Sequence, residues 1–130
     1  MQNQANARPA SGSDGARVAE TALLQGLYKV EFETPRGKAS GVIIAENGKL
    51  RGGSSAFAYF GSYVQDGQSF TGKVSSLRHT PDADHPSVFG FDEVKINFSG
   101  TVKGHLAICE GTATDFPSLA FKAVLTRVAD

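Results

Sequence analysis

The segment from His79 to His85 gathers the residues best suited to bind a metal ion or to transfer protons. Its sequence, HTPDADH, also contains Asp82 and Asp84. Imidazole nitrogens and carboxylate oxygens are common zinc ligands, and a zinc site needs roughly three or four of them in convergent geometry. The same side chains carry an enzymatic hypothesis. The alternative is a solvated loop, in which prolines interrupt the chain and aspartates cap turns. We favour the loop and expect no metal.

Cys109 is the single cysteine and therefore the one thiol that could act as a nucleophile. It lies in the apolar stretch Leu106–Cys109, LAIC, and a free cysteine often packs like a small hydrophobic side chain. We interpret it as a core residue. One cysteine forms no intramolecular disulfide, so nothing in the sequence demands an oxidising compartment.

Other catalytic motifs lack the setting that their chemistry needs. The segment Val74–His79, VSSLRH, has serines and a histidine but not the glycines of a nucleophile elbow. A phosphate-binding glycine loop joins a strand to a helix, whereas RGGSSA (residues 51–56) leads into a strand. The acidic pair Asp92-Glu93 is expected at the surface, where a strand begins. The sequence therefore predicts no enzymatic activity and no cofactor.

The charge balance argues against two classes of partner. Thirteen basic residues offset thirteen acidic ones, and no run of five lysines or arginines occurs. Proteins held by nucleic-acid phosphates usually carry a basic excess, so we expect no direct nucleic-acid binding and no attachment to a membrane surface. No apolar run approaches the roughly 20 residues that span a bilayer, and no secretory apolar region follows Met1. We expect a cytoplasmic protein.

The candidate histidines, aspartates and cysteine all lie in one predicted domain, which begins at Gly26. Residues 1–25 are expected to form a flexible extension, because their first part, MQNQANARPASGSDGAR, has almost nothing to bury. From Gly26 onward, Tyr28, Val30 and Phe32 alternate with charged residues, the pattern of a half-buried strand. The predicted domain therefore covers residues 26–130.

Turn signals divide this domain into short strands. Asn47-Gly48 and Asp66-Gly67 are strong hairpin signals, and Pro35 with Gly37 marks another turn. The one long connection, Thr80–Glu93, contains two prolines and a small apolar cluster, and we expect a short helix or a helical turn in it. The expected strands cover residues 26–33, 39–45, 50–53, 57–64, 69–79, 94–103, 105–113 and 119–128.

Eight short strands joined mainly by hairpins must hide their sheet edges, and closure into a barrel does so. The predicted fold is therefore all-β, an eight-stranded antiparallel up-and-down β-barrel. A sandwich of two sheets is the alternative.

The segment RGGSSAFAYFGSY (residues 51–63) combines large aromatic residues with glycines. We interpret it as a strand entry followed by a curved barrel strand, in which glycine permits coiling or leaves internal space. The aromatic residues either fill an ordinary core or line a cavity that holds one small ligand. The candidate cavity-lining residues are Tyr28, Phe32, Phe57, Tyr59, Gly61, Phe70, Gly72, Phe98, Gly100 and Phe121.

Several segments together resemble the GrlR family, whose members are negative regulators of type III secretion gene expression. The resemblance is carried by GLYKVEF (residues 26–32), GVIIAENGKLRGG (41–53), YFGSY (59–63), and Arg78 followed by Pro86-Ser87-Val88. It covers nearly all of residues 26–130 and implies a lipocalin-like small barrel with an apolar cavity and a tendency to form homodimers.

The resemblance also implies a function without chemistry, the binding of a transcriptional regulator protein. The family's partner contact is a Glu-Asp-Glu-Asp run, which aligns with Gln65–Gln68 here, and only Asp66 matches it. We carry over Asp66 alone as a candidate partner-binding residue. The alternative function is a carrier or sensor of a small apolar ligand, which requires an interior cavity of about 300 Å³ or more.

Overall fold

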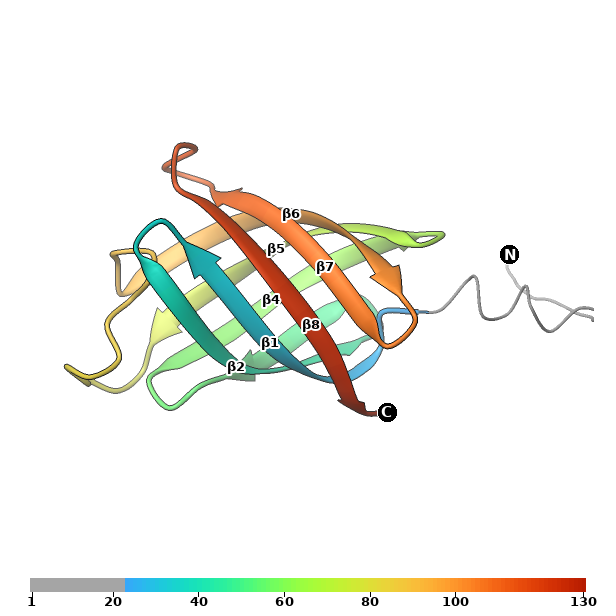
Figure 1. Ribbon diagram of the computed structural model, residues 1–130, viewed down its shortest axis with the longest axis horizontal. Coiled ribbons are helices and arrows are strands. Elements are labelled where there is room, and N and C mark those ends of the chain that lie inside the picture. Colours follow the sequence, from blue (N-terminus) through green and yellow to red (C-terminus); the bar gives the residue numbers. More distant parts are fainter. Residues whose placement is uncertain (1–22) are drawn as a thin grey trace, which may run out of the picture.

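The computed structural model describes residues 23–130, which form eight strands and no helix (Figure 1). None of these residues therefore belongs to a helix that could cross a membrane. The flexible extension predicted for residues 1–25 lies, up to residue 22, outside the described residues. The strands are β1 (Gly26–Thr34), β2 (Gly37–Glu46), β3 (Lys49–Gly53), β4 (Phe57–Asp66), β5 (Ser69–Arg78), β6 (Glu93–Lys103), β7 (Leu106–Ala113) and β8 (Ala120–Ala129).

The strands follow one another around a closed antiparallel barrel, and β8 returns to pair with β1. This confirms the predicted eight-stranded up-and-down barrel and excludes the two-sheet sandwich. The closing ladder runs from Leu27 opposite Ala129 to Glu33 opposite Lys122. Figure 1 shows the tilted strands and places both ends of the described chain at one end of the barrel.

The tight hairpins form where the sequence predicts them. Asn47 and Gly48 both have positive φ, 50° and 82°, as a type I′ turn between β2 and β3 requires. Gly67 has a φ of 63° in the turn between β4 and β5. These turns set the register in which the flanking strands pair.

The long loop between β5 and β6, residues 79–92, contains neither the predicted short helix nor a helical turn of hydrogen bonds. Two reverse turns stand in its place, closed by hydrogen bonds from the amide of His85 to the carbonyl of Asp82 and from Gly90 to Ser87. The physical reason is the proline spacing: Pro81 and Pro86 lie five positions apart, and proline disfavours the helical conformation in the residue before it.

Apolar side chains close the barrel at both ends. At the end where the described chain begins and ends, which we call the base, Leu24 is 2% exposed and its carbonyl accepts a hydrogen bond from the hydroxyl of Tyr63. At the opposite end, the mouth, the long loop inserts Phe89, which is 4% exposed. The ring of Phe89 stacks on Phe32 at 5.9 Å and meets Phe121 edge-on at 6.0 Å between ring centroids. The loop is therefore part of the core.

Glycines in the barrel wall make room for phenylalanine rings from the neighbouring strand. A Cβ atom added at Gly72 would lie 2.6 Å from the ring of Phe98, its partner in the β5–β6 ladder. A Cβ atom at Gly100 would lie 2.7 Å from the ring of Phe70, which pairs with it in the same ladder. Such cross-strand glycine–aromatic pairs permit the sharp coiling of a small barrel.

The plug at the mouth supplies a first prediction. Replacing Phe89 with alanine removes a buried ring that is 4% exposed, so we expect the free energy of unfolding to fall by about 3 kcal/mol or more. The matched control is Phe91→Ala in the same loop. Phe91 is 42% exposed and loses mainly its stacking with Phe116, worth about 1 kcal/mol. Urea unfolding followed by circular dichroism measures both; equal losses would show that Phe89 is not part of the core.

Candidate functional site

The barrel interior holds a small apolar cavity of about 80 Å³ that is lined from Leu24 at the base to Phe89 at the mouth. Ligand sites for small molecules usually occupy about 300–1,000 Å³. Side chains from the barrel strands therefore fill most of the interior. Its lining residues are Leu24, Val30, Phe32, Ile43, Leu50, Tyr59, Phe70, Val74, Ser76, Phe89, Ile96, Phe98, Cys109, Phe121, Ala123 and Leu125.

The residues expected to line a cavity fall into three groups. Phe32, Tyr59, Phe70, Phe98 and Phe121 line this interior cavity.

Two others lie at the ends of the barrel. Tyr28 is buried near the base, where its hydroxyl accepts a hydrogen bond from Arg127. Phe57 lies at the mouth, beneath the guanidinium group of Arg78.

The glycines form the third group, and none of them borders empty space. A Cβ atom at Gly61 would lie 2.0 Å from the carbonyl oxygen of Lys73 on β5, so the backbone of the next strand occupies the position. Gly72 and Gly100 are covered in the same way, by carbonyl oxygens and by the phenylalanine rings described above. These glycines serve close approach between strands.

A groove beside the mouth has a volume of about 650 Å³. It exists because β2 is ten residues long whereas β3 has five, so the β2–β3 ladder ends at Val42 opposite Gly53. One wall is the unpaired part of β2, the opposite wall is the β3–β4 connection at Ser54 and Ser55, and the long loop covers the top. Phe32, Phe57, Tyr59 and Ser76 are also among its lining residues.

The β2 wall offers backbone hydrogen-bonding groups. Pairing sides alternate along an antiparallel strand, and the two-residue turn at Asn47-Gly48 makes Glu46, Ile44 and Val42 the residues that bond to β3. The same alternation directs the amide and carbonyl groups of Lys38 and Ser40 toward the side where β3 has ended. No backbone partner for either residue lies among residues 23–130 on that side.

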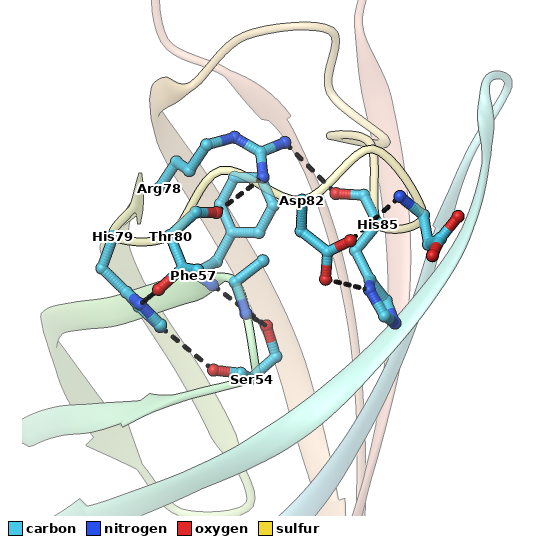
Figure 2. Close-up of polar contacts among 9 residues, drawn as sticks. Ser54, Phe57, Arg78, His79, Thr80, Asp82 and His85 are labelled. Atoms are coloured by element: carbon cyan, nitrogen blue, oxygen red, sulfur yellow. Dashed lines mark hydrogen bonds and ion pairs between the residues drawn. The ribbon is translucent and has the colours of Figure 1, made fainter.

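Arg78 at the end of β5 fixes the long loop over the groove. Its Nε donates to Asp92 at 2.8 Å, and its two terminal nitrogens donate to the carbonyls of Thr80 and His85 at 3.1 and 3.2 Å. The guanidinium carbon lies 4.4 Å from the centroid of the Phe57 ring, a cation–π contact visible in Figure 2. One side chain thereby joins the loop to the barrel wall.

His79, the next residue, holds the opposite wall. Its Nε2 contacts the carbonyl oxygen of Ser54 at 3.1 Å and its Nδ1 contacts the hydroxyl of Thr80 at 2.7 Å (Figure 2). The amide of His79 also donates to the carbonyl of Ala56. The cover and the far wall of the groove are therefore anchored to two adjacent residues at the end of β5.

Asp82 and His85 form a separate pair within the loop. His85 Nδ1 lies 2.7 Å from a carboxylate oxygen of Asp82, and the amide of Asp84 donates to the other oxygen at 3.0 Å. These hydrogen bonds, from His85 first and then from Asp84, hold the pKa of the Asp82 carboxyl below its usual value. The pair stabilises the turn that begins the loop.

The geometry does not assemble the metal site considered from the sequence. Across residues 23–130, no three His, Cys, Asp or Glu side chains converge on one point. His79 is directed at Ser54 and Thr80, whereas His85 is directed at Asp82. His79 contacts the hydroxyl of Thr80, whereas His85 makes no hydrogen bond to a serine or threonine hydroxyl within residues 23–130.

The groove rim carries an excess of positive charge. Arg36 and Lys38 line it, and neither forms an ion pair with any described residue. Asp84 is the one carboxylate among the groove's lining residues in the described chain. Glu33 stands opposite Lys38 in the β1–β2 ladder without pairing with it. An acidic group entering the groove would therefore meet two cations that form no ion pair with a described residue.

Asp66, the candidate partner-binding residue, lies elsewhere. It ends β4 at the hairpin tip near the base, at the opposite end of the barrel from the groove (Figure 1). Its neighbour Gln65 accepts a hydrogen bond from the amide of Leu24 at 2.8 Å and so helps to fix the base. The structure therefore separates Asp66 from the groove.

Exposed apolar side chains gather on the outer face of β2–β5. Val42 and Ile44 on β2 are each 48% exposed, and Phe60 on β4 is 45% exposed. The ladders place Arg51 of β3 between Ile44 and Phe60. We call Val42, Ile44, Phe60 and Leu77 the outer apolar face; Leu77 extends it onto β5 beside Ala58.

The sequence interpretation missed the groove, its basic rim and the Phe89 plug. A signal for the groove was present in the sequence. The expected second strand was longer than the third, and Ser54-Ser55 separated the expected third strand from the fourth. A signal for the plug was the apolar cluster Val88-Phe89 inside a polar loop.

Comparison with family models and with curated proteins assigns the chain to no family. No protein-family model matches the chain, and no curated protein is significantly similar to it.

The anchoring by Arg78 gives a second prediction. In Arg78→Lys the charge remains, but one ammonium group is unable to reach Asp92, Thr80 and His85 together. We expect stability to fall by about 1–2 kcal/mol and loop amides at residues 80–90 to exchange at least about tenfold faster. Arg51→Lys on exposed β3 is the control and should leave the loop unchanged. Hydrogen exchange by NMR measures this, and unaltered loop protection in Arg78→Lys would contradict it.

Cys109 gives a third prediction. Burial, with a smaller contribution from the charge of Glu110, raises the pKa of its thiol from 9.0 to about 12. The protonated thiol therefore favours the folded state. That stabilisation is fully present below pH 9 and is lost as pH rises toward 12, because the unfolded thiol ionises first.

The comparison of native protein with Cys109→Ala isolates this effect. The urea midpoint of the native protein should fall more steeply between pH 8 and about 10.5 than that of Cys109→Ala. Burial also raises the pKa of Tyr59 and Tyr63, but both proteins share those residues. Parallel slopes in the two proteins would contradict the prediction.

Proposed function

We propose that this chain is a GrlR-like, non-enzymatic regulatory protein that acts in the cytoplasm by binding a transcriptional regulator protein. The observation that carries the proposal is the outer apolar face on β2–β5. Its members Val42, Ile44 and Phe60 are nearly half exposed although they belong to regular strands. Exposed apolar side chains that gather on one face and are bordered by polar residues such as Arg51 are typical of protein–protein contact surfaces.

Two further features support a binding role. The interior is filled except for about 80 Å³, and both ends are closed by Leu24 and Phe89. The His79–His85 segment, which suggested chemistry, contributes its side chains to holding a loop in place. The sequence segments that resemble the GrlR family supply the class of partner.

The carrier hypothesis receives less support from the same geometry. It requires an interior of about 300 Å³ or more, whereas the cavity is about 80 Å³. Its lining side chains, such as Phe70 and Phe98, are packed in contact at 6.0 Å between centroids, so a lipid chain would have to displace them.

The proposal predicts that a charge in the outer apolar face releases the partner. The full chain is expressed at near-native level in its own cells, cross-linked and recovered, and bound proteins are identified by mass spectrometry. We expect a transcriptional regulator with the native chain and its loss, by about tenfold or more, with Ile44→Asp and Phe60→Asp, because a buried unpaired charge is costly.

Val64→Asp is the matched control, since Val64 is on the same strand as Phe60, is 73% exposed and lies nearer the base. It should retain the regulator. Recovery of no regulatory protein, or equal loss with Val64→Asp, would contradict the proposal. Size-exclusion chromatography with light scattering detects the alternative occupant of this face, a second copy of the chain.

A further inference from the structure

We infer that the groove beside the barrel mouth binds an extended acidic peptide segment, which adds to the free edge of β2 as a short strand. The free edge is the part of β2 from Gly37 to Gly41 that β3 does not reach. This inference deepens the proposed function, on which it rests, because it names the part of the partner protein that this groove would take.

The backbone of β2 specifies an extended chain. Lys38 and Ser40 each direct one amide and one carbonyl into the groove, at the spacing of alternate strand residues. Another strand satisfies such groups with the same spacing of donors and acceptors, which is the basis of recognition by strand addition. A compact ligand or a helix would leave some of them unpaired, at a cost of about 1–3 kcal/mol for each group removed from water.

The groove also specifies which side chains the added strand would carry. A residue opposite Ala39 would point inward, toward Phe57 and Val88, which are both buried. A small or β-branched apolar residue suits that position. Residues opposite Lys38 and Ser40 would point outward, because facing residues in a ladder project on the same side.

Charge decides the outward positions. Lys38 and Arg36 lie on the rim without ion-pair partners in the described chain, and Asp84 is the groove's single opposing carboxylate there. Glutamate or aspartate at the outward positions would pair with the two cations. The expected ligand is therefore a segment of about four residues or more in which apolar and acidic residues alternate, at about 3.3 Å per residue along β2.

The surrounding contacts keep the groove open in this form. Arg78 and His79 hold its cover and its far wall, and the hydroxyl of Thr34 donates to the carbonyl of Val88 where the loop meets the β1–β2 hairpin. The site is thus formed before the peptide binds, so little of the binding free energy is spent on ordering the protein.

A random dodecapeptide library displayed on phage, selected on the purified full chain, tests the inference. We expect enriched peptides with alternating apolar and acidic residues. In complexes with a synthetic enriched peptide, the amides of Lys38 and Ser40 should gain hydrogen-exchange protection. Enrichment of no sequence, or of basic sequences, would overturn the inference, as would binding without protection of these two amides.

Two variants test the backbone and the charges separately. Ser40→Pro removes one amide donor, and proline is tolerated on an edge whose amide faces the free side; we expect affinity to fall by about tenfold or more. Arg36→Glu with Lys38→Glu should reverse the preference from acidic to basic peptides. Lys103→Glu with Lys122→Glu, on β6 and β8, is the charge-matched control and should bind as the native chain does.

The amide NMR spectrum and the thermal midpoint show whether Ser40→Pro is folded. If Ser40→Pro does not fold, the variant Arg36→Glu with Lys38→Glu still tests the inference. Unchanged peptide affinity in folded Ser40→Pro, or an unchanged acidic preference after charge reversal, would overturn the inference. In cells, loss of the regulator with Phe60→Asp but not with these groove variants would leave the proposed function standing and remove the peptide site. If no regulator is recovered from cells but the purified chain still binds the peptide, the proposed function is contradicted and the peptide site remains.

Discussion

The pairing of β1 with β8 is the constraint on which the rest of the structure depends. Once Leu27 lies opposite Ala129, the sheet closes and its two terminal strands no longer offer free edges. Closure also brings the inner faces of all strands around one narrow interior, which large residues must fill without clashing. The glycine–phenylalanine pairs on β5 and β6 are the local solution: each ring lies where its neighbour has no side chain. Closure and aromatic packing therefore require each other.

A barrel closed by strands of unequal length leaves a defect where a strand is short. β3 ends at Gly53, and β2 continues for the length of Gly37–Gly41 without it. The long loop lies over this defect and extends Phe89 into the mouth, held by Arg78 and by Thr34. The loop thereby completes the core that the strands leave open, while the edge of β2 beneath it remains accessible from the groove.

The barrel and its strands could be predicted from sequence because their signals are local. Period-two alternation marks each strand, and Asn47-Gly48 and Asp66-Gly67 mark turns whose backbone few other residues adopt. The role of the glycines was harder to predict, since Gly61 could equally border a void or a neighbour, and the neighbour is Lys73 on another strand. The groove depends on strand lengths differing by a few residues, where boundaries from sequence are least certain. The segment His79–His85 shows the same limit: its composition suggests a metal site, whereas its side chains point to different partners.

The free edge of β2 has features that separate recognition from aggregation. Long, flat, uncharged edges pair indiscriminately with other strands, and natural proteins blunt them with lysine, short length or a covering loop. This edge has all three, in Lys38, in the few residues beyond β3, and in the loop from Asp84 to Phe89. Lys38 lies opposite Glu33 in the β1–β2 ladder, but neither Lys38 nor the nearby Arg36 forms an ion pair with a described residue. Unpaired cations along a partly covered edge repel a second copy of the same edge and attract an acidic strand, so one arrangement supplies both protection and selectivity.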